Sequence, residues 1–362
     1  MSTFVGGLRL SGHFYEEAVR PVLETSFPGL QHSAALIGYG SEVLGYDDAR
    51  STDHEWGPRL LLFLSEEDHR VRADSIVEIL RNELPHEFGG YPTHFGEPDE
   101  EGVRLAEKKA SGPVDHKVEV HTVGGFFSAW TGLDPFEEWG SAEWLCVPQQ
   151  RLLEVTAGRV YHDGIGELQV ARARLRYYPR DVWLYLLAAQ WARVGEQEAF
   201  VGRTGEAGDE LGSRLVAAGL VRDIMGLCFL MERRYAPYAK WFGTAFSRLR
   251  CAPRLGPVLD AVLSARYWGE REGRLSEAYG IVAGMHNALG LTPPLGTGVS
   301  RYHDRPYLVV HSGRFVAALE RAIQDQAVLS VPHRAGSIDQ ICDSTDVLSR
   351  PETYLKLKGF FE

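Results

Sequence analysis

The chain has 362 residues, of which 44% are hydrophobic and 24% charged, and its formal net charge is −11 at pH 7. This length predicts two domains, and the composition is that of an ordinary globular protein. The negative charge offers no general attraction for a polyanion, which makes a nucleic-acid partner unlikely. The longest apolar run, 182–192, is shorter than the ~20 residues that span a bilayer, so no membrane partner is expected.

The cysteines and the N-terminus favour a cytoplasmic location. Cys146, Cys228, Cys251 and Cys342 form no C-x-x-C pair, so neither a zinc knuckle nor a dithiol redox motif is present. The N-terminal 19 residues lack the charged start and the continuous apolar core of a signal peptide. We therefore expect a cytoplasmic protein with reduced thiols.

The first part of the chain mixes strand-like and helix-like segments. Apolar runs at 33–37 and 60–64 predict buried strands, and a capping box at 65–68 predicts a helix that ends near residue 85. The Gly-, Pro- and charge-rich segment 86–116 is typical of a long loop. Strict alternation over 117–123 predicts a half-buried strand.

From about residue 150 the apolar residues recur at three- and four-residue spacing, which predicts helices. We expect one short extended piece at 307–311 and a last helix at 312–324. The predicted fold is α+β, with a first domain at 1–147 that mixes strands and helices and a mostly helical second domain at 148–362.

The stretch GYGSEVLGYDDARSTDHEWG, residues 38–57, contains the strongest candidate site. A dinucleotide fingerprint is disfavoured because Val43 stands where the third glycine would fall. Gly40 and Ser41, at the start of a helical segment, would instead offer N–H groups and a hydroxyl to a terminal phosphate. On an extended chain Asp53 and Glu55 would project to one side, with His54 on the other, and both carboxylates could bind Mg²⁺.

Glu119 is the best candidate for a third acid, because it lies on the predicted strand 117–123 between Lys117 and His121. Three acids from two strands and a Gly-Ser turn predict one metal site, with Lys117 near the phosphates. The alternatives are a plain glycine turn with a solvated acidic loop, and a Glu119 that is paired with Lys117 or His121. A zinc site at His116 and His121 lacks a third ligand at useful spacing.

Cations and aromatic residues also gather at 232–241, where they could hold a triphosphate and stack on a base. Lys240 and, further upstream, Arg222 are the candidate phosphate contacts. The alternative is a helix end with packed rings and arginines whose charged ends reach the solvent.

The order of Gly-Ser, a linker, D-x-[DE] and a later acid on a strand resembles the nucleotidyltransferase superfamily. That superfamily includes DNA polymerase beta, the poly(A) and CCA enzymes and the antibiotic adenylyltransferases. The wording GYGSEVLGYDDARSTDHEWGPR, with YYPRDVW further on, looks like an uncharacterised bacterial branch with a helical C-terminal domain. The superfamily motif covers about residues 30–125. The resemblance implies that 1–147 form the catalytic domain, a mixed sheet with flanking helices, and that 148–362 form a helical substrate-binding domain.

The resemblance implies phosphate contact by Gly40 and Ser41 and binding of Mg²⁺ or Mn²⁺ by Asp53 and Glu55. It implies metal binding or base action by Glu119. Two features depart from the pattern: Glu55 stands where Asp is common, and Pro58 interrupts the N–H ladder soon afterwards, which suggests an edge strand or a bend.

We therefore expect an enzyme that transfers a nucleoside monophosphate, AMP from ATP above all, to a hydroxyl of a small-molecule acceptor and releases pyrophosphate. Two alternatives stay open. The enzyme could modify a protein or an RNA, as a toxin or a regulator, or the protein could be a nucleotide sensor that has the fold and no activity.

Overall fold

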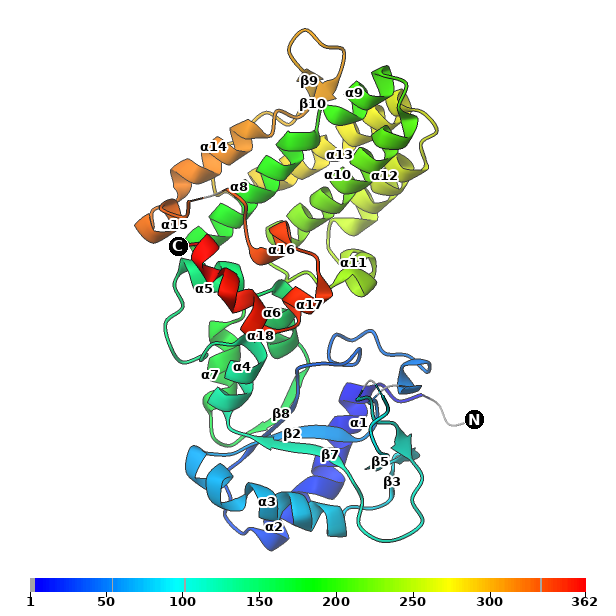
Figure 1. Cartoon of the computed structure of the whole chain (residues 1–362), viewed down its shortest axis with the longest axis vertical. Helices are drawn as coiled ribbons and strands as arrows, with labels where there is room; N and C mark the ends of the chain where they lie inside the picture. Colours follow the sequence, from blue (N-terminus) through cyan, green and yellow to red (C-terminus); the bar gives the residue numbers. More distant parts are fainter. Residues whose placement is uncertain (1–3, 54, 101, 333) are drawn as a thin grey trace. The chain divides into compact units, whose positions relative to one another are not determined.

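The structure is a computed structural model that describes residues 4–53, 55–100, 102–332 and 334–362. It is an α+β protein that divides into two compact units (Figure 1). The first unit comprises Met1–Glu138 and Arg151–Arg176, and the second comprises Trp139–Gln150 and Tyr177–Glu362. The chain thus crosses between the units three times. The catalytic and substrate-binding roles assigned to residues 1–147 and 148–362 stay predictions.

The first unit is built on a small mixed sheet with the strand order β7-β2-β1-β8. Strand β2 runs parallel to β7, and β1 runs antiparallel to both of its neighbours. The strands are β1 Ser33–Leu36, β2 Arg59–Phe63, β7 Lys117–His121 and β8 Arg159–Asp163. The first three confirm the sequence-based predictions, whereas β8 was not predicted.

Pro58 does not mark an edge, because β2 lies between β7 and β1. The proline directly precedes Arg59, the first residue of the strand, so its missing N–H removes no bond from the ladder. The suggestion of an edge strand at this point was therefore wrong.

Helices α1 Gly7–Phe14, α2 Arg20–Ser26 and α3 Glu66–Glu83 cover one face of the sheet. A turn of π-helix, Tyr15–Val19, joins the first two. The helix α3 begins as predicted, where the Ser65 hydroxyl accepts the Asp68 N–H at 3.1 Å. The core between helices and sheet is apolar, and its largest buried members are Phe14, Tyr15, Leu23, Leu60, Leu62, Leu64, Ile76, Leu80 and Leu84.

The remaining elements of the first unit are short. Helix α4, Val123–Thr131, follows β7, and α6, Gln149–Thr156, leads into β8. The long segment 86–116 folds into two small strand pairs, β3 with β4 and β5 with β6. Their bounds, with the other short elements, are β3 Glu87–Phe88, β4 Tyr91–Pro92, β5 His94–Phe95, β6 Ala106–Glu107, α7 Glu167–Arg174 and the 3₁₀ turn Ser51–Asp53.

The second unit is helical, as predicted, and α8, Arg180–Gln197, packs between α10, Glu210–Met231, and α14, Gly313–Ala322. The rings of Trp191 and Phe315 stack 4.2 Å apart where α8 meets α14. The other elements are α5 Ser141–Cys146, α9 Phe200–Glu206, α11 Ala239–Phe246, α12 Ala252–Ser264, α13 Trp268–Ala288, β9 Ser300–Arg301, β10 Leu308–Val309, α15 Gln326–Leu329, α16 Ile338–Ile341, α17 Thr345–Leu348, α18 Pro351–Tyr354 and the 3₁₀ turn Leu355–Phe360.

The expected last helix at 312–324 is therefore followed by further short helices, which the sequence did not suggest. Within the described residues, none of the helices combines the length and the hydropathy that crossing a bilayer requires.

Candidate functional site

The polar residues of the candidate site lie on the sheet face opposite the helices α1 to α3. In the parallel register, Arg59 pairs with Lys117 and Leu61 pairs with Glu119. Leu60 and Leu62 point into the helix-covered core, so their neighbours Arg59 and Leu61 point to the other face. The strand alternation thus brings Arg59, Lys117 and Glu119 to one surface, as the pattern of 117–123 predicted for the last two.

The chain before β2 is not extended, which corrects the expected geometry of the acidic pair. Asp53 ends the 3₁₀ turn Ser51–Asp53, and Glu55 has a left-handed backbone with φ of +46°. The Glu55 N–H donates to the Arg104 carbonyl at 3.1 Å, which stabilises this conformation. Strand alternation therefore does not set where the two carboxylates point. His54 and the side chain of Asp53 lie outside the described residues.

Glu55 is paired with Lys117 across 62 residues of sequence. The Lys117 ammonium donates to the Glu55 carboxylate at 2.9 Å, and the two side chains are only 13% and 23% exposed. Tyr39 lies near enough for the charge of Glu55 to act on the ionisation of its hydroxyl. Burial raises the pKa of Tyr39 well above its ordinary value, and the charges of Glu119 and Glu55 raise it further against the opposing effect of Arg59.

Glu119 lies close to the same groups and is paired with its strand neighbour. His121 Nε2 is 3.3 Å from a Glu119 carboxylate oxygen. Burial opposes ionisation, but the His121 hydrogen bond and the charges of His121, Lys117 and Arg59 lower the pKa of Glu119 below its ordinary value. Glu119 therefore carries its negative charge at neutral pH, and pairing with His121, left open by the sequence, is present.

We expected Gly40 and Ser41 at the start of a helical segment, but they lie in a turn. The Gly45 N–H donates to the Glu42 carbonyl at 3.0 Å and the Tyr46 N–H to the Ser41 carbonyl at 2.8 Å, but no helix of the described residues begins here. Gly40 has a left-handed φ of +119°, and a Cβ atom there would collide with the side chains of Arg59 and Glu42. Packing against these two side chains thus accounts for Gly40.

Arg59 and Glu42 form a buried ion pair that sequence reasoning missed. Arg59 Nε donates to Glu42 Oε1 at 2.7 Å, and the side chains are 5% and 3% exposed. Arg59 also donates to the Tyr39 carbonyl and lies over the Tyr39 ring at 4.2 Å from its centroid. Burial opposes the positive charge, yet the attraction of Glu42 raises the pKa of Arg59. The sequence did offer one indication of this pair: Arg59 directly precedes the apolar run 60–64, and a charged residue next to a buried strand needs a partner of opposite charge.

Three aromatic rings, those of Tyr39, Phe126 and Trp130, pack on one another beside Arg59. Trp130 of α4 stacks on Tyr39, with centroids 6.1 Å apart, and on Phe126, at 5.4 Å. The Trp130 indole N–H donates to Glu154 at 2.8 Å, which fixes the orientation of the ring. The Arg151 guanidinium lies 5.1 Å from the Trp130 centroid and 3.0 Å from Glu154. These residues were not among the predicted site residues.

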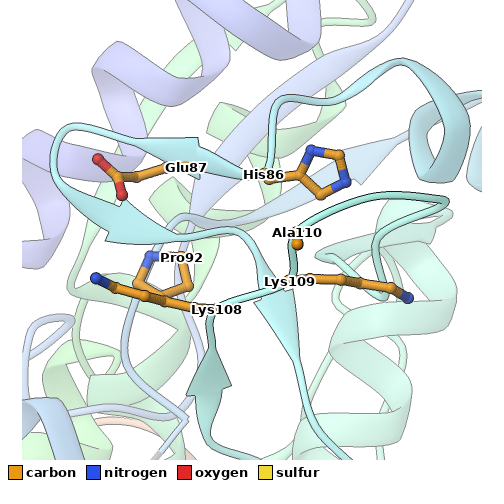
Figure 2. Close-up of a pocket in the computed structure, with 6 residues that line it drawn as sticks. All are labelled: His86, Glu87, Pro92, Lys108, Lys109 and Ala110. Atoms are coloured by element: carbon orange, nitrogen blue, oxygen red, sulfur yellow. The ribbon is translucent and has the colours of Figure 1, made fainter.

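The segment 86–116 forms a pocket away from all predicted site residues. Its volume is about 340 Å³, and its lining residues are His86, Glu87, Pro92, Lys108, Lys109 and Ala110. Figure 2 shows that the side chains of Lys108 and Lys109 point in opposite directions, so their charges do not converge on one point. The pocket therefore lacks a focused anion site.

The two predicted phosphate contacts outside the first unit have local partners in the second unit. Arg222 is 3.4 Å from Asp343, and both side chains are exposed. The Lys240 ammonium lies 5.2 Å from the ring centroid of its neighbour Trp241.

The described carboxylates alone do not form a metal centre. In the part of the chain that the structure describes, no group of three or more His, Cys, Asp and Glu side chains is placed to hold a metal ion. Glu55 and Glu119 provide oxygen donors of the kind that Mg²⁺ prefers, and the Asp53 side chain lies outside this description.

Comparison with known proteins gives one match. A family model described as "Domain of unknown function (DUF4037)" matches residues 144–242. The match includes the YYPRDVW motif, Arg222 and Lys240, and it lies outside the segment that contains Gly40, Ser41 and the three acids. No curated protein and no solved structure matches the chain.

Proposed function

We propose that the protein is a nucleotidyltransferase that transfers a nucleoside monophosphate, most readily AMP from ATP, to the hydroxyl of a small-molecule acceptor. The observation that carries the proposal is the ion pair of Glu55 with Lys117 at 2.9 Å, which brings Glu55 to the face of β7 that also carries Glu119, 64 residues away in sequence. Clusters of ionised carboxylates beside a cation are costly to build and are common at sites of group transfer.

The fold supports the same proposal. The superfamily resemblance implies a Gly-Ser turn, a linker, the D-x-[DE] acids and a later acid on a strand. The structure has β1, the turn at Gly40 and Ser41, β2 and β7 in this order. Asp53 and Glu55 would hold Mg²⁺ or Mn²⁺, which neutralises charge on the triphosphate when bound, and Glu119 would be the third acid of the site and act as the base.

The chain's own residues would act on the acceptor and on the nucleotide. The acceptor hydroxyl oxygen would form a bond to the α-phosphorus while the bond to the α,β-bridging oxygen breaks, so that pyrophosphate leaves. Glu119, ionised at neutral pH, would accept the hydroxyl proton. Lys117 would bind a phosphate oxygen.

One observation favours a second candidate, a nucleotide sensor without activity. Glu55 and Glu119 each already have a positively charged or protonatable partner, Lys117 and His121. A metal ion would compete with these partners for the carboxylate oxygens. A sensor would bind the nucleotide without releasing pyrophosphate.

Pyrophosphate release distinguishes the two candidates. The protein is incubated with Mg²⁺, each of the four nucleoside triphosphates and fractionated cell metabolites. We expect release with at least one fraction and its loss in Glu119→Gln and Glu55→Gln. The matched control Glu66→Gln/Glu67→Gln removes two exposed acids at the start of α3 and should retain activity. Nucleotide binding without release from any fraction would support the sensor.

A further inference from the structure

The second unit has a concentration of positive charge that the net charge of the chain conceals. Residues 232–254, named here the basic lobe, contain six basic residues and a single acid, Glu232, in a chain whose net charge is −11. The basic residues are all exposed, and they are Arg233, Arg234, Lys240, Arg248, Arg250 and Arg254. Such a local excess is typical of a surface that binds an anionic partner.

Hydrogen bonds from Glu232 hold the beginning of the basic lobe to residues 250 and 251, near its end. The buried Glu232 carboxylate accepts the backbone N–H groups of Arg250, at 2.9 Å, and of Cys251, at 2.8 Å. Between these ends lies α11, whose Phe242 packs on Phe229 of α10 with centroids 5.1 Å apart. The segment is therefore a folded local unit, and its basic residues belong to one ordered piece of the second unit.

The single acid does not neutralise this surface. The Glu232 side chain is 8% exposed and accepts backbone N–H groups of the lobe, whereas Arg250, its ion-pair partner at 3.4 Å, is 86% exposed. Burial opposes ionisation, but the N–H groups of Arg250 and Cys251 lower the pKa of Glu232, so it stays a fixed structural charge. Arg234 and Arg254 form no ion pair with any residue that the structure describes.

The chemistry of the lobe fits phosphate groups and bases. Five of its six cations are arginines, whose planar guanidinium matches the oxygens of a phosphate. The Arg233 guanidinium lies 5.2 Å and 4.9 Å from the ring centroids of Tyr177 and Trp183. The Tyr238 side chain is 46% exposed and offers a ring for stacking. Cations interleaved with an accessible aromatic ring are what single-stranded nucleic acids bind.

Two other anionic partners fit less well. A membrane surface would require apolar side chains for insertion, and Tyr238 is the only exposed large hydrophobic residue of the basic lobe, all of which the structure describes. A free triphosphate is smaller than the surface. The six cations are distributed over the stretch from Arg233 to Arg254, on α11 and on both sides of it.

We propose that the basic lobe binds single-stranded nucleic acid. This inference does not depend on nucleotidyl transfer, because every contact that supports it lies in the second unit. It also revises the expectation drawn from the net charge alone.

Binding of a labelled, unstructured 20-nucleotide RNA to the full chain, measured by fluorescence anisotropy at several salt concentrations, tests this inference. Single strands lose about 0.7 units of log affinity per log unit of salt for each phosphate contact, so six cations give a slope near −4. The variant Arg234→Gln/Lys240→Gln/Arg254→Gln should reduce the slope by about 2. The control Arg301→Gln/Arg305→Gln/Arg321→Gln removes three exposed cations elsewhere in the unit and should leave it unchanged.

Further arms identify the source of the phosphates. Matched DNA shows whether the sugar matters, and either strand supports the proposal. Three results would overturn the proposal. The protein could bind anionic vesicles but neither RNA nor DNA, or only Mg²⁺-ATP could displace the bound RNA. The lobe variant and the control could also give equal salt slopes. Arg234→Lys/Arg254→Lys preserves charge and should retain binding. If the protein binds Mg²⁺-ATP but no nucleic acid, the proposed role of the basic lobe is refuted and the proposed nucleotide site is not.

Discussion

Replacing Arg59 by methionine tests whether the buried ion pair organises the candidate site. Methionine keeps much of the apolar stem of arginine but leaves the Glu42 carboxylate, 3% exposed, without its partner at 2.7 Å. Breaking a buried pair by removing one partner costs about 3–5 kcal/mol. We therefore expect Arg59→Met to destabilise the first unit by at least about 3 kcal/mol.

The cost should largely disappear when both charges are removed. A buried ion pair is often replaced by apolar residues at little cost, so Arg59→Met/Glu42→Met should recover at least about 2 kcal/mol. The recovery separates the effect of an unpaired charge from that of lost packing.

Hydrogen exchange at the amides of β2 measures the effect in the first unit alone. A loss of 3 kcal/mol corresponds to about a hundredfold loss of protection, since 1.4 kcal/mol is tenfold. Amides of α13, in the second unit, serve as the internal reference. A loss of less than tenfold in Arg59→Met, or no recovery in the double variant, would refute the structural role given to this pair.

Two further predictions concern backbone geometry and pH. Gly40→Ala should cost more than about 1 kcal/mol by the same exchange measurement, because of its φ of +119° and the collision with Glu42, whereas Gly124→Ala, with open space around it, should be tolerated. Burial raises the pKa of Asp339 to about 6, above its unfolded value near 3.9. The folded state then binds the extra proton, so the second unit should lose stability as pH rises from about 4 to 6, and Asp339→Asn should remove this loss. If the urea midpoints of wild type and Asp339→Asn change with pH in the same way between pH 4 and 7, the raised pKa of Asp339 is contradicted.

Local patterns predicted the parts of the fold that depend on neighbouring residues. The alternation at 117–123 correctly placed Lys117 and Glu119 on one face of β7, and the Ser65 cap correctly placed the start of α3. The half-exposed edge strand β8 was missed, since its five residues lack a strong alternation and its pairing with β1 is irregular.

The geometry of the acids could not be read from the sequence because distant contacts determine it. The left-handed conformation of Glu55 accompanies a bond to the Arg104 carbonyl and an ion pair with Lys117. The Arg59 and Glu42 pair joins a strand to a turn 17 residues away. The local excess of basic residues at 232–254 is not visible in the net charge, because net charge averages over the whole chain.

Calorimetric titration with Mg²⁺-ATP tests the central claim, that Asp53, Glu55 and Glu119 form a nucleotide site, most directly. The wild type is compared with Asp53→Ala/Glu55→Ala and with the control Glu66→Ala/Glu67→Ala, which removes the same charge from the exposed start of α3. We expect wild type and control to bind in a Mg²⁺-dependent manner and the acidic-site variant to lose binding. Identical titrations for all three proteins would contradict the claim and leave the segment around Asp53 as a solvated acidic loop.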